Sequence, residues 1–533
     1  MKLIKVFILV FILFVFVSSI NSVPSNKAYE LIVKDGFIID GSGNPWFKAD
    51  IGIKNKKIAM IGLIDENKAQ RVINAANLMV CPGFIDIHTH CDRSILQVPT
   101  VDNYIHQGVT TVIGGNCGGH PFPLKELFEK IKEKGISPNF GCLVGHNTIR
   151  RQVMEFKMSS PTKEELEKMK ALISQEMKAG ALGFSTGLSY LPGIYSKIDE
   201  LIELASVVAP FGGIYATHLR DQGQHITDAI KEAIEIGEKN NIPVQISHIK
   251  LAEDAVWSEL ERITNPVEEA RKRGVEVTLD QYPYTATSSG FSSSFPSWAF
   301  EGGREKFLVR LEDRDTYEKI KAFVIKRRLT STKGIDKPGT IYIARSSKFP
   351  EYEGKNLKEI LLEQGKEPTS QNAADLIIEI EKSGGASGVF FQMDEKDVMD
   401  LMRLPYNMHG SDGGIQIMGK GVPHPRNYGT FPRVIGYYVR KKGAISLGDA
   451  IRKMTSLPAQ VLRLTKRGMI NEGMYADITI FDFHSFEDRA AFDKPHQYSR
   501  GLKYVIINGD VVVDGGKHTG KLPGMILYGQ GKI

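Results

Sequence analysis

Hydrophobic and polar residues alternate along the middle of the chain in a regular way. Between about residues 83 and 464, short apolar runs of strand length are separated by stretches with apolar residues at helical spacing. The pattern predicts eight strands, at residues 84–88, 110–114, 140–144, 182–186, 214–218, 244–248, 276–280 and 407–411. Eight strands with intervening helices predict an α/β fold, a (β/α)8 TIM-like barrel, whose functional groups gather at the carboxyl ends of the strands.

Near both ends of the chain, the pattern changes to short apolar runs on either side of turn residues. Three hairpins are predicted, with their turns at residues 35–36, 55–57 and 508–509. A lone hairpin is marginal in water, so strands from both ends are expected to share one sheet system. We therefore expect a small β-sandwich domain made of residues 23–82 and 466–533, with the barrel, residues 83–465, inserted into it.

One interval in the barrel pattern is too long for a single strand–helix unit. From Asp280 to Asp412 the chain runs for 132 residues, against about 30 for one unit. An inserted subdomain after the seventh strand is therefore predicted at about residues 300–400, with helices near 315–328 and 371–382. It fits either a lid over the barrel mouth or inert packing.

Residues 1–22 have the order of a secretory signal peptide. Lys2 and Lys5 flank the start, an apolar run follows from residue 6 to 17, and small polar residues come next. The run is shorter than the roughly 20 residues that a membrane-spanning helix needs. We expect export to the periplasm or the outside of the cell, with a retained N-terminal membrane anchor as the alternative.

The composition changes this picture little. The chain is 42% hydrophobic and 24% charged, as in ordinary soluble proteins. A net charge of +6 on 533 residues is mild, and no long basic run with interleaved aromatics occurs, so nucleic acid is not an expected partner. Four cysteines are few for a disulfide-built protein, although Cys81 and Cys91 could pair in an oxidising compartment. The sequence predicts no oligomeric state.

Residue types that bind metals gather at the ends of the predicted strands. Residues two apart in a strand point to the same side, so His88 and His90 after the first strand face one point. The second, fifth, sixth and eighth strands end near Cys117, His218, His248 and Asp412. Taken singly, each is more simply a core or turn residue, but together at one rim they predict a metal site. Imidazole nitrogen and thiolate suit zinc better than magnesium or calcium.

Three further side chains near the strand ends are candidates for a pocket. His146 follows the third strand and fits the pocket wall or a structural role about equally. Tyr282 ends the seventh strand, where an aromatic residue could belong to the core but a tyrosine hydroxyl could also bind a ligand. Arg426 lies in a loop bounded by proline and glycine after the eighth strand. It is either a solvent-exposed arginine or a bidentate clamp on a substrate carboxylate.

Several stretches resemble the N-acyl-D-amino-acid deacylases (D-aminoacylases) of the amidohydrolase superfamily. They are residues 82–90, 115–118, 185–190, 280–284 and 424–433, and the resemblance runs from about Tyr29 to Leu527. The first stretch is typical of the whole superfamily, whereas the cysteine-containing stretch and the last one are more specific. Many two-metal relatives that open cyclic amides carry a carboxylated lysine on the fourth strand. Residues 183–187 contain none, so the resemblance implies that Cys117 supplies the bridging anion.

The resemblance also implies roles for individual residues. A tight zinc would be held by Cys117, His218 and His248. A second, weaker metal position would involve His88, His90 and the bridging Cys117. Asp412 would be the catalytic carboxylate. The amino-acid part of the substrate would be held by Tyr190, Tyr282, Ser288 and Arg426.

The implied activity is zinc-dependent hydrolysis of the amide bond of a small-molecule N-acyl-D-amino acid. The products would be a carboxylate and a free D-amino acid. One alternative is another amidohydrolase that acts on cyclic amides or dipeptides. The other is a non-catalytic binding protein on the same scaffold, which would be expected to lack a ligand residue or Asp412. The sequence retains all of them.

Overall fold

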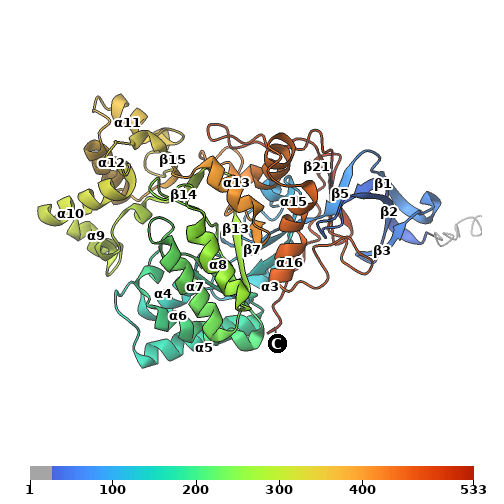
Figure 1. The fold of residues 1–533 in the computed structure, drawn as a ribbon, viewed down its shortest axis with the longest axis horizontal. Coiled ribbons are helices and arrows are strands. Elements are labelled where there is room, and N and C mark those ends of the chain that lie inside the picture. The colour runs from blue at the N-terminus through green and yellow to red at the C-terminus, as the bar shows by residue number, and fades with distance from the viewer. Residues whose placement is uncertain (1–26, 533) are drawn as a thin grey trace, which may run out of the picture.

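The computed structural model describes residues 27–532, so the expected signal peptide, residues 1–22, lies outside the described residues. Within the described range, none of the helices has the length and apolar character needed to cross a bilayer. Figure 1 shows a central α/β region, with an inserted subdomain at one end of the long axis and the sheet of the two chain ends at the other.

Two parallel sheets form the central region. One has the strand order β17-β13-β12-β11-β10-β9 and the other the order β6-β7-β8. The strands are β6 (Phe84–Asp86), β7 (Val109–Gly114), β8 (Asn139–Cys142), β9 (Val144–Gly145), β10 (Gly183–Gly187), β11 (Ile214–His218), β12 (Val244–Ile246), β13 (Val277–Gln281) and β17 (Asn407–His409). Each overlaps one of the eight predicted segments, and β8 and β9 share one of them because a single residue separates them.

Backbone hydrogen bonds connect the two sheets at both of their edges. Beside β8 and β10, the Leu182 N–H donates to the Cys142 carbonyl at 2.9 Å. Beyond the carboxyl ends of β6 and β17, the Asp412 N–H donates to the His88 carbonyl at 2.8 Å. Through the second bond, the backbones of His88 and Asp412, two of the predicted functional residues, are in direct contact.

Amphipathic helices cover these sheets. In α5, Met169, Ile173 and Met177 lie four residues apart on one buried face, and a capping box of Thr162 and Glu165 fixes the start of the helix. The helices of this region are α2 (Asp102–Ile105), α3 (Leu124–Lys134), α4 (His146–Met154), α5 (Lys163–Ala179), α6 (Ile198–Ser206), α7 (Ile226–Asn240), α8 (Glu261–Lys272), α13 (Glu395–Arg403), α14 (Arg426–Arg433), α15 (Leu447–Met454) and α16 (Ser456–Val461).

The chain between β13 and α13 forms a subdomain with its own hydrophobic core, which includes Phe291, Phe307 and Phe390. Its antiparallel sheet has the order β14-β16-β15. The elements are β14 (Ala286–Gly290), α9 (Arg304–Arg310), α10 (Arg314–Val324), the π-helical segment η7 (Ile325–Leu329), β15 (Ile341–Arg345), α11 (Leu357–Glu363), α12 (Ser370–Lys382) and β16 (Ser387–Phe391). The sheet begins ahead of residue 300 because β14 starts just after β13, at the carboxyl end of the central strands.

Strands from both chain ends share one nine-stranded sheet, in which β5 pairs with β18. The strands are β1 (Tyr29–Ile38), β2 (Phe47–Lys54), β3 (Lys57–Gly62), β4 (Ala69–Asn74), β5 (Met79–Pro82), β18 (Ile478–Phe481), β19 (Leu502–Ile507), β20 (Asp510–Asp514) and β21 (Lys517–His518). Beyond β21 the chain returns to the central region, where the Leu527 N–H donates to the Phe140 carbonyl at 2.7 Å.

One of the three predicted hairpins is wrong. The antiparallel pairs β2–β3 and β19–β20 enclose the turns at residues 55–57 and 508–509. In contrast, β1 continues through Asp35 and Gly36, where its register with β2 shifts. Asp35 has a positive φ of 59°, which suits a bulge as well as a tight turn. The Asp50 carboxylate accepts the Asp35 N–H at 2.8 Å and so holds the bulge in place.

A buried polar network joins the terminal sheet to the central region. The Asp477 carboxylate pairs with the Arg467 guanidinium. It also accepts the Asn508 N–H at 2.8 Å and the Asn139 amide at 3.1 Å. Asn139 is the first residue of β8, and Asp477 is 6% exposed. One carboxylate thus connects a central strand with the sheet of the chain ends.

We predict that Asp477→Ala destabilises the protein by about 3 kcal/mol, because it leaves the Arg467 charge buried without a partner. Denaturant unfolding followed by circular dichroism measures the change. The matched control is Asp514→Ala, whose ion pair with Arg71 is about half exposed and should contribute less than about 1 kcal/mol. Equal losses for the two variants would contradict a connecting role for Asp477.

Candidate metal centre

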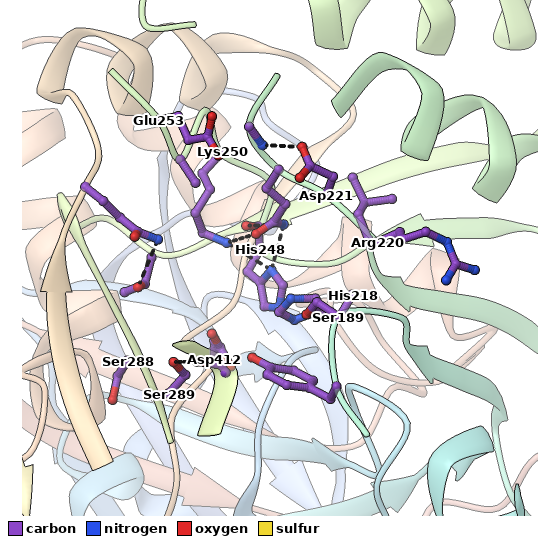
Figure 2. A pocket seen from close by; sticks show the side chains of 18 of the residues that line it. Ser189, His218, Arg220, Asp221, His248, Lys250, Glu253, Ser288, Ser289 and Asp412 are labelled. Atoms are coloured by element: carbon purple, nitrogen blue, oxygen red, sulfur yellow. Dashed lines mark hydrogen bonds between the residues drawn. The ribbon is translucent and has the colours of Figure 1, made fainter. Parts of the chain in front are cut away.

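Cys117 lies among three imidazole rings. Its Sγ is 3.4 Å from His88 Nε2, 3.7 Å from His218 Nδ1 and 3.5 Å from His248 Nε2. One ligand atom from each of His88, Cys117, His248 and Asp412 lies within 4.8 Å of all the others. Figure 2 shows His218 and His248 next to each other, with Asp412 facing the same space. Donor atoms that follow five different strands therefore converge on one point.

Asp412 brings His90 and Arg426 to the same cluster. Its Oδ1 is 3.1 Å from His90 Nε2 and 3.5 Å from His88 Nε2. Its Oδ2 is 2.8 Å from Arg426 Nη1. All six side chains predicted to surround the metal are thus neighbours. The four residues whose ligand atoms lie within 4.8 Å of one another include His88 but not His218. The resemblance implied that His218 would bind the tight zinc, and its Nδ1 does lie 3.7 Å from the Cys117 sulfur.

The distances fit a zinc ion. With Zn–S near 2.3 Å and Zn–N near 2.0–2.1 Å, two ligands of a tetrahedral site lie roughly 3.5 Å apart. The three S–N distances around Cys117, from 3.4 to 3.7 Å, agree with this spacing. One thiolate with several imidazoles favours zinc over magnesium or calcium, which prefer oxygen ligands. The donors present therefore fit the metal that the sequence predicted.

Three of the residues in this cluster have a strained backbone conformation that orients their side chains toward one another. Cys117, His248 and Asp412 have φ values of 53°, 37° and 49°, a left-handed region that residues with a Cβ rarely adopt and that costs of order 1 kcal/mol or more each. Hydrogen bonds hold two of the three: His248 N–H donates to Asp280 Oδ1 at 2.8 Å, and Asp412 N–H donates to the His88 carbonyl. Fixed strain of this kind is typical of functional sites.

Asp280, the second-to-last residue of β13, contacts two of the histidines. No role was assigned to it from the sequence. Its carboxylate oxygens lie 3.3 and 3.4 Å from His88 Nδ1, and one of them accepts the His248 N–H. Gln245 donates to the same carboxylate at 2.6 Å. A carboxylate behind a metal-binding histidine fixes its tautomer and orientation. The available signal was a carboxylate at the carboxyl end of a predicted strand.

The local charges favour the metal-binding forms of Cys117, Asp412 and His248. Burial raises the pKa of the Cys117 thiol, but the His88 and His248 rings outweigh burial and bring the pKa well below its usual value. Burial also opposes ionisation of Asp412, yet Arg426 and the histidines hold its pKa well below the ordinary range. Burial, more than any other cause, lowers the pKa of His248 to about 3. Burial opposes protonation of His88 and His90, but Asp280 and Cys117 raise the pKa of His88, and Asp412 and Cys117 raise that of His90. Thiolate, carboxylate and neutral imidazole are the metal-binding forms, so a metal would have to displace the protons of these two rings.

Lys250 is a second functional candidate that the sequence analysis missed. It lies two residues after His248, is 3% exposed, and its Nζ is 3.2 Å from His248 Nδ1. The Nζ donates to Gln222 Oε1 at 2.7 Å and lies 5.5 Å from the centre of the Tyr282 ring. Arg426 lies 4.7 Å from the centre of the same ring. Figure 2 shows the Lys250 side chain extending toward His248, beside the cavity.

Three cavities open beside this centre, and Ser288 and Asp412 line all of them. The largest has a volume of about 690 Å³, the size of a small-molecule site. Tyr190 lines two of them, with its ring 4.5 Å from that of His218. The cationic lining residues are Arg93, Arg151, Arg220, Lys250, Arg327, Arg328, Arg345, Lys420 and Arg426. They outnumber the acidic lining residues and favour an anionic ligand.

Three open interpretations can now be settled. Cys81 and Cys91 are both buried free thiols, so they do not form a disulfide. His146 lies outside the cavities, and its Nε2 is 2.9 Å from a Glu200 oxygen, which is a structural role. Arg426 is 5% exposed and paired with Asp412, so it is not a solvent-exposed arginine.

Comparison with known proteins gives concordant results. The sequence pattern of the amidohydrolase family matches residues 71–305 and 367–513. The chain is 33% identical over 529 residues to a D-aminoacylase of Alcaligenes xylosoxydans xylosoxydans, covering 95% of this chain and 99% of that protein. It is 31% identical over 505 residues to an N-acyl-D-glutamate deacylase of the same organism, covering 91% and 93%.

A solved structure is similar over the same range. The N-acyl-D-glutamate deacylase of Bordetella bronchiseptica, in complex with zinc and a phosphonate mimic of the tetrahedral intermediate, matches with a TM-score of 0.80 and 29% identity. The match covers 94% of this chain and 99% of that one. The similarity therefore includes the inserted subdomain and both chain ends as well as the central region.

We predict that Cys117→Ser abolishes stoichiometric zinc binding, because three imidazoles lose the sulfur they share. Asp280→Asn should weaken zinc affinity by about 10- to 100-fold, the usual effect of losing a carboxylate behind a ligand. Competition with a chromophoric chelator measures both. Cys81→Ser, another buried cysteine but one in the terminal sheet, is the control. Wild-type zinc affinity in Cys117→Ser would refute the proposed donor.

Proposed function

This chain belongs to the amidohydrolase family, and we propose that it is a zinc-dependent deacylase of N-acyl-D-amino acids. It would hydrolyse their amide bond to a carboxylate and a free D-amino acid. The observation that carries the proposal is the convergence of Cys117, His88, His218 and His248 beside Asp412 in a cationic cavity. The similarity to a D-aminoacylase over nearly the whole chain supports the choice of substrate.

We propose that zinc is held by Cys117, His218 and His248, and that His88, His90 and the same cysteine form a second, weaker position. When bound, zinc supplies a Lewis acid that polarises a carbonyl and lowers the pKa of a coordinated water from about 15.7 toward 7. Asp280 keeps His88 oriented for this purpose, and Gln222, which lies 3.3 Å from His248 Nδ1, contacts the other side of the His248 ring.

Asp412 is the proposed proton carrier. Its lowered pKa keeps it ionised at neutral pH, so it can accept a proton from the attacking water. As the amide carbon–nitrogen bond breaks, the same carboxyl donates this proton to the leaving nitrogen, which departs as the neutral amine. His90 at 3.1 Å and Arg426 at 2.8 Å fix its two oxygens in place. One residue therefore serves as base and then as acid without moving far.

The substrate's α-carboxylate would lie against Arg426, with Lys250 as a nearby second cation. Tyr190, Tyr282 and Ser288 would form the walls around the amino-acid part. Without substrate, Arg426 is paired with Asp412. If Arg426 also paired with a substrate carboxylate, it would stabilise the Asp412 carboxylate less, and the pKa of Asp412 would rise. Substrate binding would then make Asp412 a better base at the moment when one is needed.

The architecture supports a related proposal. We propose that the two parallel sheets close into one (β/α)8 barrel, supported by the hydrogen bonds at both pairs of edges. The nine-stranded sheet would form the small β-sandwich, with residues 83–465 as the catalytic unit between its two halves. The charge and apolar pattern of residues 1–22 supports export. Retention of this segment as an anchor is the alternative.

The first prediction concerns the substrate. Zinc-loaded protein should hydrolyse N-acetyl-D-amino acids with a kcat/KM at least 10-fold above that for their L-enantiomers, because Arg426 and Asp412 fix the carboxylate and the proton carrier relative to each other. Measuring free amino acid release for N-acetyl-D-, N-acetyl-L-, D-dipeptide and hydantoin substrates tests this. Faster turnover of a cyclic amide or dipeptide would favour another amidohydrolase activity.

The second prediction concerns Asp412. Asp412→Asn keeps the size of the side chain but cannot carry the proton, so kcat should fall by about 10²- to 10⁴-fold. Zinc content, measured by mass spectrometry of the metal, should stay near the wild-type value because the shared sulfur is untouched. Zinc retained together with full turnover would remove Asp412 from the proposed role.

A further inference from the structure

Two neighbouring arginines in the substrate cavity, Arg327 and Arg328, come from the inserted subdomain. Arg328 belongs to η7, the π-helical segment that follows α10. Its side chain lines the same cavity as Lys250, Tyr282 and Asp412. The central strands therefore supply the proposed metal ligands, while the inserted subdomain, which has its own hydrophobic core, places the Arg328 guanidinium in the proposed substrate cavity.

The contacts of Arg328 are all with neutral groups. Its Nη1 donates to the Gln392 amide oxygen at 2.9 Å and its Nη2 to the Ser293 hydroxyl at 3.2 Å. The guanidinium carbon lies 4.6 Å from the centre of the Phe390 ring. The Nε is buried and has no hydrogen-bond partner. These contacts fix the direction of the guanidinium without neutralising its charge.

Within the described part of the chain, no carboxylate lies close enough to Arg328 for an ion pair. Burial, followed by the neighbouring Arg327, lowers the pKa of Arg328 to about 9. A partly buried charge without a counterion is costly, and part of this cost is recovered when an anion binds. Arg426, which also lines the cavities, already has Asp412 as its counterion at 2.8 Å, and Arg220 pairs with Glu232. The remaining arginines of the cavity lining are exposed to solvent, so Arg328 is the partly buried arginine whose charge is left for a ligand.

We infer that Arg328 binds the side-chain carboxylate of the amino-acid part of the substrate, which makes N-acyl derivatives of acidic D-amino acids the preferred substrates. This inference rests on the proposed deacylase function. A dicarboxylate would place its α-carboxylate against Arg426 and Lys250 and its second carboxylate against Arg328. A neutral side chain of the same shape would leave the Arg328 charge enclosed without a partner, so the cavity should reject it.

The test compares N-acetyl-D-glutamate with N-acetyl-D-glutamine, which differ by one charged group. In the wild type, kcat/KM for the glutamate derivative should be at least about 10-fold higher, as expected for a charge-assisted bond to a partly buried arginine. In Arg328→Met the preference should fall to about 1. In Arg328→Lys, which keeps the charge but loses the planar fork, it should be intermediate.

Arg310→Met is the matched control. Arg310 lies in the same subdomain and donates to the Ala299 and Glu301 carbonyls, but it lines none of the three cavities beside the metal centre. It should keep the wild-type ratio of the two kcat/KM values. Melting temperatures of all variants show whether the subdomain is intact.

Two results would overturn the inference while leaving the deacylase function standing. The first is a wild-type enzyme that hydrolyses both derivatives equally well. The second is an Arg328→Met enzyme that keeps the wild-type ratio. Failure of the wild type to hydrolyse any N-acyl-D-amino acid would instead overturn the proposed function, and this inference with it.

Discussion

The sulfur of Cys117 is shared by three imidazole nitrogens, and this arrangement constrains the rest of the structure. The three rings follow β6, β11 and β12, so these strands must end at the same level and face one point. The Cys117 thiolate and the Asp412 carboxylate lie close together inside the protein, and Arg426 pairs with the carboxylate alone. A divalent cation would balance the thiolate as well, which would explain why two anions are tolerated there. The strained backbone and the Asp280 hydrogen bonds hold the same geometry.

The substrate side of the cavity is built differently from the metal side. Metal-binding residues follow short buried strands whose ends are fixed by parallel pairing. Ser288 and Arg328 come from the inserted subdomain, which has a separate hydrophobic core. A change in that subdomain can alter which side chain the enzyme accepts without moving the metal. Because both parts line the cavities beside Asp412, chemistry and selectivity can be assigned to different segments of the chain.

The sequence predicted the structure correctly where a hydrophobic pattern fits only one kind of element. Buried strands between amphipathic helices gave all eight central segments, and the residues picked out at their carboxyl ends lie together around Cys117. It failed at Asp35-Gly36, because a positive φ suits a bulge and a turn equally. Asp280 and Lys250 were missed because their roles depend on which residue of another strand lies opposite. Arg328 could not be found at all, since no local pattern reports how an inserted subdomain faces the central sheets.

The most direct measurement of the central claim is X-ray absorption at the zinc edge of the zinc-loaded protein. The structure predicts one sulfur scatterer at about 2.3 Å together with imidazole nitrogens at about 2.0–2.1 Å. In Cys117→Ser the sulfur contribution should disappear from whatever zinc remains. A wild-type spectrum with nitrogen and oxygen scatterers alone would contradict the account, because it would show that the ion does not bind where the strands converge.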